Sequence, residues 1–197
     1  EASWLRALGT SASMDLAQCH LHNFATLAGL APAPGPKFVL AHFLPPHHPY
    51  LFDREGNVLR NATLSNQFEF QKQLWEKREG YIDQLMFVNS RIEQVIDRLI
   101  AGSATPPIIL LQSDHGPNLR RGLKATEHFR VRLTNLNAVL LPGAPPELMP
   151  ADATPVNHYC DAGLPLRPDR HFVSQFGQPY RFIEVDENGA RLEAAAD

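Results

Sequence analysis

The sequence predicts an α/β fold, and three observations lead to that class. The chain has 197 residues, of which 44% are hydrophobic and 20% charged, so it is large enough for one globular domain with a core. Short apolar runs of strand length occur at residues 37–43 and 108–111, with a long helical pattern between them. The second run leads directly into Asp114, His115 and Gly116, the way an α/β sheet presents functional side chains at the carboxyl end of a strand.

The first predicted element is a helix over residues 14–30. Its apolar side chains recur near helical spacing from Leu16 to Leu30, and the Pro- and Gly-containing segment 31–36 ends it. A strand over residues 37–43 is predicted next, because the segment is short and mostly apolar. Prolines in the following residues forbid regular strand pairing, so a stiff loop should begin there.

The middle of the chain predicts a strand, helix and strand unit. Apolar positions between residues 66 and 99 step by threes, fours and sevens, which is typical of one long amphipathic helix. This helix feeds the strand 108–111, so a right-handed crossover would make the two strands parallel. Their carboxyl ends then share one sheet edge, and we expect the loop after residue 43 to converge with the Asp-His-Gly turn.

Two later strands complete the predicted sheet. Residues 138–141 are apolar and end at the turn sequence 142–145, which contains two prolines and a glycine. Residues 180–185 alternate in polarity and precede the turn 186–189, so they are predicted to form an edge strand.

The predicted sheet edge gathers residues that suit metal and anion chemistry. The carboxylate of Asp114 and a neutral His115 imidazole suit zinc, manganese or a similar divalent ion. The alternative is an Asp that caps a turn beside a surface His. His47 and His48 lie in a proline-rich loop and are either functional or a solvated pair, and His42 is either a ligand or a buried structural histidine.

Basic side chains follow the predicted metal motif. Arg120, Arg121 and Lys124 could surround an anionic ester, since a guanidinium matches sulfate or phosphate oxygens, or they could be ordinary surface charge.

Two cysteines, Cys19 and Cys160, allow one disulfide but do not fix the redox compartment. Together with His22 and His158 they also have zinc-ligand chemistry, and Cys19 and His22 share one helical face. A structural zinc would require that the two pairs meet.

Composition excludes some partners and leaves others open. The net charge of -3 and the lack of a Lys/Arg block argue against nucleic acid. No apolar run approaches the roughly 18 residues that cross a bilayer, and no signal peptide is visible. The sequence starts at Glu1, so we expect a piece of a longer protein whose membrane anchor would lie upstream. Oligomeric state cannot be predicted.

Four segments of the chain resemble one enzyme family. They are residues 36–42 (PKFVLAH), 46–50 (PHHPY), 112–116 (QSDHG) and 135–143 (NLNAVLLPG). In this order they resemble the carboxyl-terminal part of a sulfatase-like hydrolase of the alkaline-phosphatase superfamily, which includes arylsulfatases, phosphoethanolamine transferases and lipoteichoic acid synthase. The resemblance implies a mostly parallel sheet flanked by helices, as a single partial domain over residues 1–197. Its core would be 37–156, and 157–197 would be an extension with the edge strand.

The resemblance also implies roles for individual residues. Asp114 and His115 would bind the catalytic metal, and His47 would contact the sulfate or phosphate group. Lys124 resembles the sulfatase lysine that binds ester oxygens, so His47 and Lys124 are the catalytic candidates. His42 and Arg120 are added as candidates for substrate binding.

The family's nucleophile is expected on strands well upstream of the Pro-His-x-Pro loop. Only 46 residues precede His47, and no Cys/Ser-x-Pro-x-Arg signature is present among them. Thr10 or Ser11 could be nominated, but we expect the nucleophile segment to lie outside this chain and the fragment to be inactive alone. Many relatives that share the His loop are extracytoplasmic domains of membrane-anchored bacterial proteins, so the resemblance implies a periplasmic or extracellular location.

Two functions follow from these observations. The first is a metal-dependent sulfatase-like hydrolase or phosphotransferase domain that acts on sulfate or phosphate esters. Manganese or zinc is favoured as its metal because His115 offers nitrogen, and calcium or magnesium is the alternative. That choice favours phosphoryl transfer to or from an anionic lipid headgroup or envelope polymer. The second is a non-catalytic binding module that retains the sulfatase scaffold.

Overall fold

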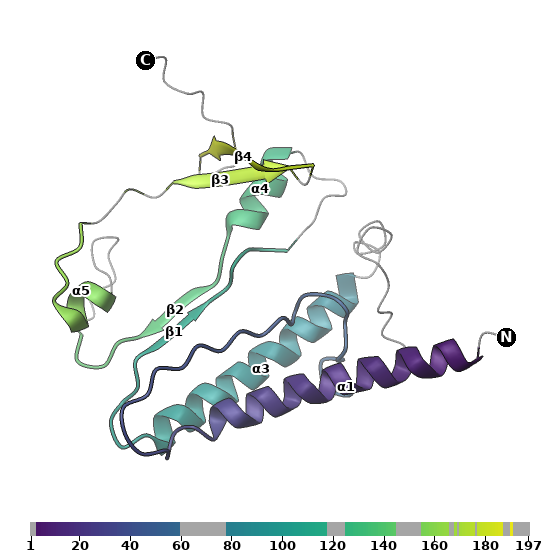
Figure 1. Cartoon of the computed structure of the whole chain (residues 1–197), viewed down its shortest axis with the longest axis horizontal. Helices are drawn as coiled ribbons and strands as arrows, with labels where there is room; N and C mark the ends of the chain where they lie inside the picture. The colour runs from purple at the N-terminus through teal and green to yellow at the C-terminus, as the bar shows by residue number, and fades with distance from the viewer. Residues whose placement is uncertain are drawn as a thin grey trace. The chain divides into compact units, whose positions relative to one another are not determined.

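The structure is a computed structural model that describes most of the chain, namely residues 3–59, 78–117, 125–144, 155–165, 168, 170–175, 177–186 and 190. The chain forms two compact units, Glu1–Pro106 and Pro107–Asp197. Figure 1 labels their helices and strands.

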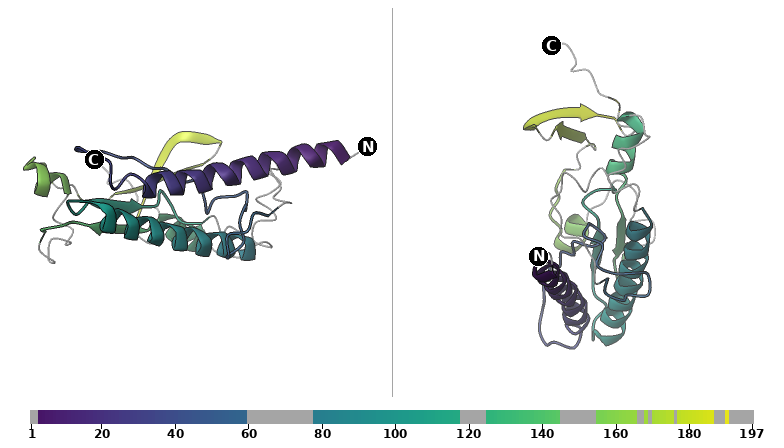
Figure 2. Two further views of the ribbon diagram at one scale, coloured as in Figure 1. Left: turned by 90° about the horizontal axis from the view of Figure 1, so that it is seen from below. Right: turned by 90° about the vertical axis from the view of Figure 1, so that its right-hand side faces the viewer.

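Unit 1 is built on two long helices that lie side by side, α1 (Ser3–Ala28) and α3 (Arg78–Gly102) (Figures 1 and 2). The helix predicted at 14–30 is confirmed and begins earlier. The helix predicted at 66–99 is confirmed from Arg78 onward, and its predicted beginning lies outside the described residues. In the described part of the chain, no helix is long and apolar enough to span a membrane.

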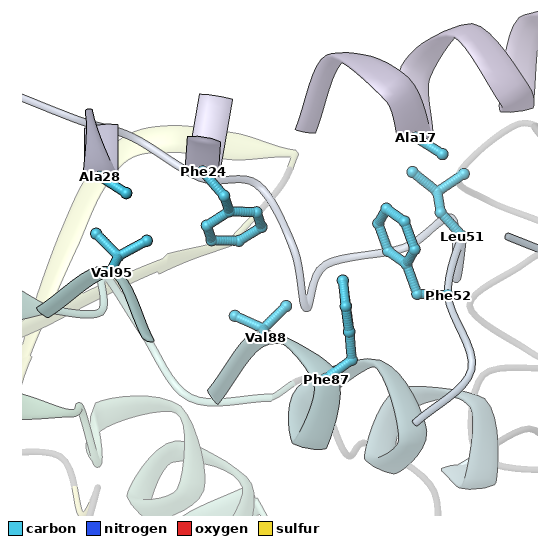
Figure 3. Packing of buried hydrophobic residues seen from close by; sticks show 8 residues of the cluster. All are labelled: Ala17, Phe24, Ala28, Leu51, Phe52, Phe87, Val88 and Val95. Atoms are coloured by element: carbon cyan, nitrogen blue, oxygen red, sulfur yellow. The ribbon is translucent and has the colours of Figure 1, made fainter. Parts of the chain in front are cut away.

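The core of unit 1 lies between these helices and the segment that connects them. Apolar side chains at three- and four-residue spacing put one stripe of each helix toward the other. Figure 3 shows the connecting segment inserting two side chains between the stripes, where the Phe52 and Phe87 rings lie 4.6 Å apart. The buried cluster consists of Ala17, Phe24, Ala28, Leu51, Phe52, Phe87, Val88 and Val95.

The strand predicted at residues 37–43 is wrong. The segment belongs to no strand, and Phe38 and Leu40 are 95% and 88% exposed. An apolar run becomes a strand only where a neighbouring strand accepts its hydrogen bonds, and the described part of unit 1 offers helices instead. His42, near the end of the segment, is exposed rather than buried.

Unit 2 contains the strand that carries the Asp-His-Gly motif, β1 (Ile109–Gln112), and its partner β2 (Asn137–Leu140). Both strands were predicted, but β1 does not pair in parallel with residues 37–43. It pairs antiparallel with β2, with Ile109 opposite Leu140. The reason is the path of the intervening chain, because α4 (Ala125–Leu133) returns it directly alongside β1.

A second antiparallel pair forms from β3 (His171–Gln175) and β4 (Gln178–Val185). The predicted strand 180–185 is confirmed within β4, whereas β3, α4 and α5 (Pro155–Cys160) were not predicted. All strand pairs in the described residues are antiparallel, so the mostly parallel sheet expected from the resemblance is not seen there.

Candidate functional site

The His loop, residues 44–50, follows the extended segment of unit 1. Its His47 side chain is exposed, and His47 Nδ1 lies 2.6 Å from the carbonyl oxygen of His48. A carbonyl can only accept, so Nδ1 carries the hydrogen and Nε2 is the free position of the ring. Nε2 accepts a hydrogen bond when the ring is neutral and donates to an anion when it is protonated.

Two neighbours of His47 are held in their uncharged forms. Burial, with a smaller contribution from the charge of His47, lowers the pKa of His48, whose ring lies 4.1 Å from that of His47. Burial, and then the neighbouring Tyr81, raises the pKa of Tyr50 to about 12. Tyr50 is therefore a phenol at neutral pH, and His47 is the exposed histidine of the loop.

The His loop is held from behind by Gln84 of α3. The Gln84 side chain is fully buried, and its Oε1 accepts from the backbone N–H groups of Leu51 (2.7 Å) and Phe52 (3.3 Å). Its Nε2 donates to the carbonyls of His47 (3.0 Å) and Pro49 (3.4 Å). One side chain thus contacts both the second half of the loop and the two residues that follow it.

A tight turn closes the segment after the His loop. Asp53 accepts from the backbone and side chain of Asn57 at 2.7 and 2.8 Å, and the side-chain hydrogen bond is the main reason that the pKa of Asp53 lies below its ordinary value. Arg54 donates to Asp83 of α3 at 2.6 and 2.8 Å. Because this ion pair is partly exposed, it contributes less to stability than the buried contacts of Gln84.

In unit 2, Asp114 and His115 lie next to each other directly after β1. Asp114 Oδ1 accepts from the His115 backbone N–H at 2.9 Å, and Asp114 Oδ2 lies 3.4 Å from His115 Nε2. The Asp114 side chain is 79% exposed, so its second oxygen is open to solvent. The turn therefore places a carboxylate oxygen and an imidazole nitrogen side by side.

The other ring nitrogen of His115 faces Arg132 of α4. His115 Nδ1 lies 2.9 Å from the Gly116 carbonyl and 2.7 Å from Arg132 Nη1, which also donates to that carbonyl at 2.9 Å. If Nδ1 accepts from Arg132, the hydrogen sits on Nε2. If Nδ1 donates to Gly116, Nε2 keeps its lone pair beside Asp114, which is the tautomer that can bind a metal.

Gly116 is required by the close approach of α4. Its N–H donates to the Arg132 carbonyl at 2.8 Å, and a Cβ at this position would lie 1.9 Å from the Val131 carbonyl oxygen. The Asn135 side chain also donates to the Asp114 carbonyl at 3.3 Å. The turn is thus held by the backbone of the helix end, and a residue larger than glycine does not fit.

Asp114 and His115 fit a divalent metal as two of its ligands, because a carboxylate oxygen and an imidazole nitrogen suit manganese and zinc. No group of three His, Cys, Asp or Glu side chains placed for one ion is found within the described residues. Cys19 in unit 1 and Cys160 in unit 2 are both exposed, and neither is bonded to a cysteine of its own unit among the described residues.

The predicted site residues fall into three groups. His42 and His47 lie in unit 1, Asp114 and His115 lie in unit 2, and convergence of the two sets stays a prediction. Arg120, Arg121 and Lys124 lie outside the described residues, and Thr10 and Ser11 lie within α1.

Gln84 and Arg132, which contact the His loop and His115 in the structure, were not identified from the sequence. The signal for Gln84 was a polar residue on the apolar stripe of the predicted helix, whereas nothing in the sequence pointed to Arg132.

One known protein family matches the sequence of this chain. The model of the Sulfatase family matches residues 15–158, which is most of the chain and includes both the His loop and the Asp-His-Gly turn. No curated protein and no solved structure is significantly similar to the chain. The match over most of its length shows that the chain belongs to the Sulfatase family, whose fold is the α/β fold of the alkaline-phosphatase superfamily.

Proposed function

We propose that this chain carries the metal-binding and anion-binding part of an enzyme that cleaves or transfers sulfate or phosphate esters. Membership of the Sulfatase family supports activity of this general kind. The single observation that carries the finer proposal is the pairing of Asp114 Oδ2 with His115 Nε2 at 3.4 Å, directly after β1.

In this proposal Asp114 and His115 hold one divalent ion, together with ligands from elsewhere in the protein. The bound ion would supply positive charge that stabilises the tetrahedral sulfur or phosphorus centre. His115 binds through Nε2 while Nδ1–H donates to the Gly116 carbonyl, which fixes the ring orientation. Arg132 can then keep its hydrogen bond to the same carbonyl, but its Nη1 must move away from Nδ1–H, because two donors repel each other at the present 2.7 Å.

His47 supplies the anion contact. Its Nδ1–H is occupied by the His48 carbonyl, so Nε2 can hold an ester oxygen or protonate the leaving group. Lys124 is proposed to bind the ester oxygens as well, and Arg120 and His42 are further candidates for substrate contact. These roles require that the His loop and the Asp-His-Gly turn face one site.

The nitrogen ligand also bears on substrate class and location. An Asp and His pair suits manganese or zinc better than calcium or magnesium, which prefer oxygen ligands. We therefore favour phosphoryl transfer, with an anionic lipid headgroup or envelope polymer as substrate. A periplasmic or extracellular location would give access to both.

The metal assignment can be tested on the full-length gene product. Asp114→Ala should weaken binding of manganese or zinc at least roughly tenfold, because it removes a direct ligand. Asp97→Ala is a matched control, since Asp97 is an exposed carboxylate on α3. The measurement is calorimetric titration of each metal into each variant. Equal affinities for wild type and Asp114→Ala would exclude Asp114 as a ligand.

The alternative is a non-catalytic binding module, and one observation favours it. Within the described residues, only two neighbouring side chains, Asp114 and His115, are arranged for an ion. Assays with an aryl sulfate and an aryl phosphate on the full-length gene product distinguish the two functions. Turnover that Asp114→Ala abolishes would refute the binding module, whereas metal binding without turnover of either ester would favour it.

A further inference from the structure

The side-chain amide of Gln84 is a fully buried polar group in unit 1. It lies on the apolar face of α3, next to Phe87 and Val88, and is 0% exposed. A side-chain amide has two acceptor positions and two donor hydrogens. Gln84 uses all four, with Leu51 N–H and Phe52 N–H on its oxygen and the His47 and Pro49 carbonyls on its nitrogen.

The composition of the His loop explains why a side chain, and not the backbone of a neighbouring strand, bonds to the loop carbonyls. Pro45, Pro46 and Pro49 have no backbone N–H, so the loop cannot be held by a ladder of backbone hydrogen bonds. Within the loop, the His47 N–H donates to the Leu44 carbonyl at 2.9 Å. The carbonyls of His47 and Pro49 need donors from outside the loop, and the Gln84 amide supplies them.

We infer that Gln84 is the positioning residue of His47, an inference that rests on the proposed function. Gln84 fixes the backbone on either side of His48, and the His48 carbonyl in turn fixes Nδ1 of the His47 ring. The direction of the free Nε2 therefore depends on a residue of α3 that is 37 positions away in the sequence. Gln84 touches no substrate and acts only through His47.

Two substitutions separate the functions of the amide. Gln84→Met preserves length and approximate volume but removes all four hydrogen bonds. Gln84→Glu keeps an oxygen acceptor for Leu51 and Phe52, and because burial favours the protonated carboxyl it leaves one donor for the two carbonyls of His47 and Pro49. It therefore loses fewer hydrogen bonds than Gln84→Met and serves if the first variant folds poorly. Gln94→Met is the matched control, because Gln94 is exposed on the same helix and bonds to Ser90 and Arg91 there.

The first measurement needs no activity. In the 197-residue chain, long-range nitrogen–proton spectra report the hydrogen position on the His47 ring. We expect Gln84→Met and Gln84→Glu to move its two nitrogen shifts toward an average of both tautomers, while Gln94→Met leaves them unchanged. Unchanged His47 shifts in a Gln84 variant that keeps the wild-type circular dichroism would overturn the inference.

The second measurement is a double-mutant cycle on the full-length gene product with an aryl phosphate. Gln84→Met should lower kcat/KM by about 10- to 100-fold, as expected for loss of a positioning group. In a His47→Ala background, Gln84→Met should lower kcat/KM by less than about twofold, because the imidazole ring that Gln84 positions is no longer present. Losses that multiply would overturn the inference. If His47→Ala alone leaves kcat/KM unchanged, the proposed role of His47 is wrong, and the ring spectra still decide whether Gln84 positions it.

Discussion

The His loop of unit 1 and the Asp-His-Gly turn of unit 2 are both held by a helix, but by opposite means. The loop is held by a side chain, since the Gln84 amide makes two hydrogen bonds to its backbone and two more to the residues directly after it. The turn is held by direct backbone contact, since Gly116 donates to Arg132 and leaves no room for a Cβ beside Val131.

The difference decides what each region tolerates. A loop held by a buried amide fails when polar partners are lost, because unsatisfied buried groups cost about 1–3 kcal/mol each. A turn held by close backbone approach fails when atoms are added. Substitutions that add a single methyl group should therefore affect the turn most strongly.

The largest expected effect is that of Gly116→Ala. The new Cβ would lie 1.9 Å from the Val131 carbonyl oxygen, so the end of α4 must move away from the turn. We expect the free energy of unfolding to fall by about 3 kcal/mol. Gly177→Ala is the control, because nothing lies within 4 Å of that position. Urea unfolding measures both, and equal midpoints would show that α4 does not hold the turn.

A smaller effect is expected at Gly56, in the turn that follows the His loop. Gly56 has a φ of +88°, and an added Cβ would lie 2.5 Å from the Phe87 ring. Gly35 has a similar φ of +81° but open space around it. We expect Gly56→Ala to cost about 2 kcal/mol and Gly35→Ala about 1 kcal/mol, the difference being displacement of Phe87. Identical losses in thermal unfolding would leave only backbone strain as the cause.

The smallest expected effect is the contribution of His20 to the pH dependence of the free energy of unfolding. Burial lowers the pKa of His20, whose Nδ1 has no hydrogen-bond partner among the described residues. Below about pH 6.5 the unfolded chain therefore holds more protons than the folded chain, and stability falls as the pH is lowered. His20→Leu should raise the free energy of unfolding by about 1 kcal/mol and flatten this dependence.

His22→Leu is the control for that experiment, because His22 is exposed on the same helix. Urea unfolding at several pH values between about 5 and 8 gives the comparison. Parallel curves for wild type and His20→Leu would show that His20 does not contribute to the pH dependence.

Local patterns predicted the two long helices α1 and α3 and the strands β1, β2 and β4, but they missed α4, α5 and β3. The 3.6-residue periodicity located α1 and the described part of α3, and turn residues located the ends of β1 and β2. Strand partners could not be predicted, because an apolar run such as residues 37–43 does not specify what lies beside it. The path through α4 decided the partner of β1, and no sequence pattern had indicated that helix.

In the candidate site, too, contacts between neighbouring residues could be predicted from the sequence, whereas contacts between distant residues could not. The adjacency of Asp114 and His115 follows from a strand that ends at a glycine turn, so it could be read locally. Gln84 lies 32 to 37 residues from its loop partners, and only its polarity on an apolar stripe hinted at a role. The contact of Arg132 with His115 depends on where α4 ends, which the sequence did not specify.

The long separation between Gln84 and the His loop has a consequence for the order of folding. The loop and the two residues after it gain their four hydrogen bonds to Gln84 only after the chain closes over more than thirty residues and α3 has formed. The His loop should thus be among the last parts of unit 1 to take shape. A synthetic peptide with the sequence of the loop would contain His47 but would lack Gln84, which orients its ring.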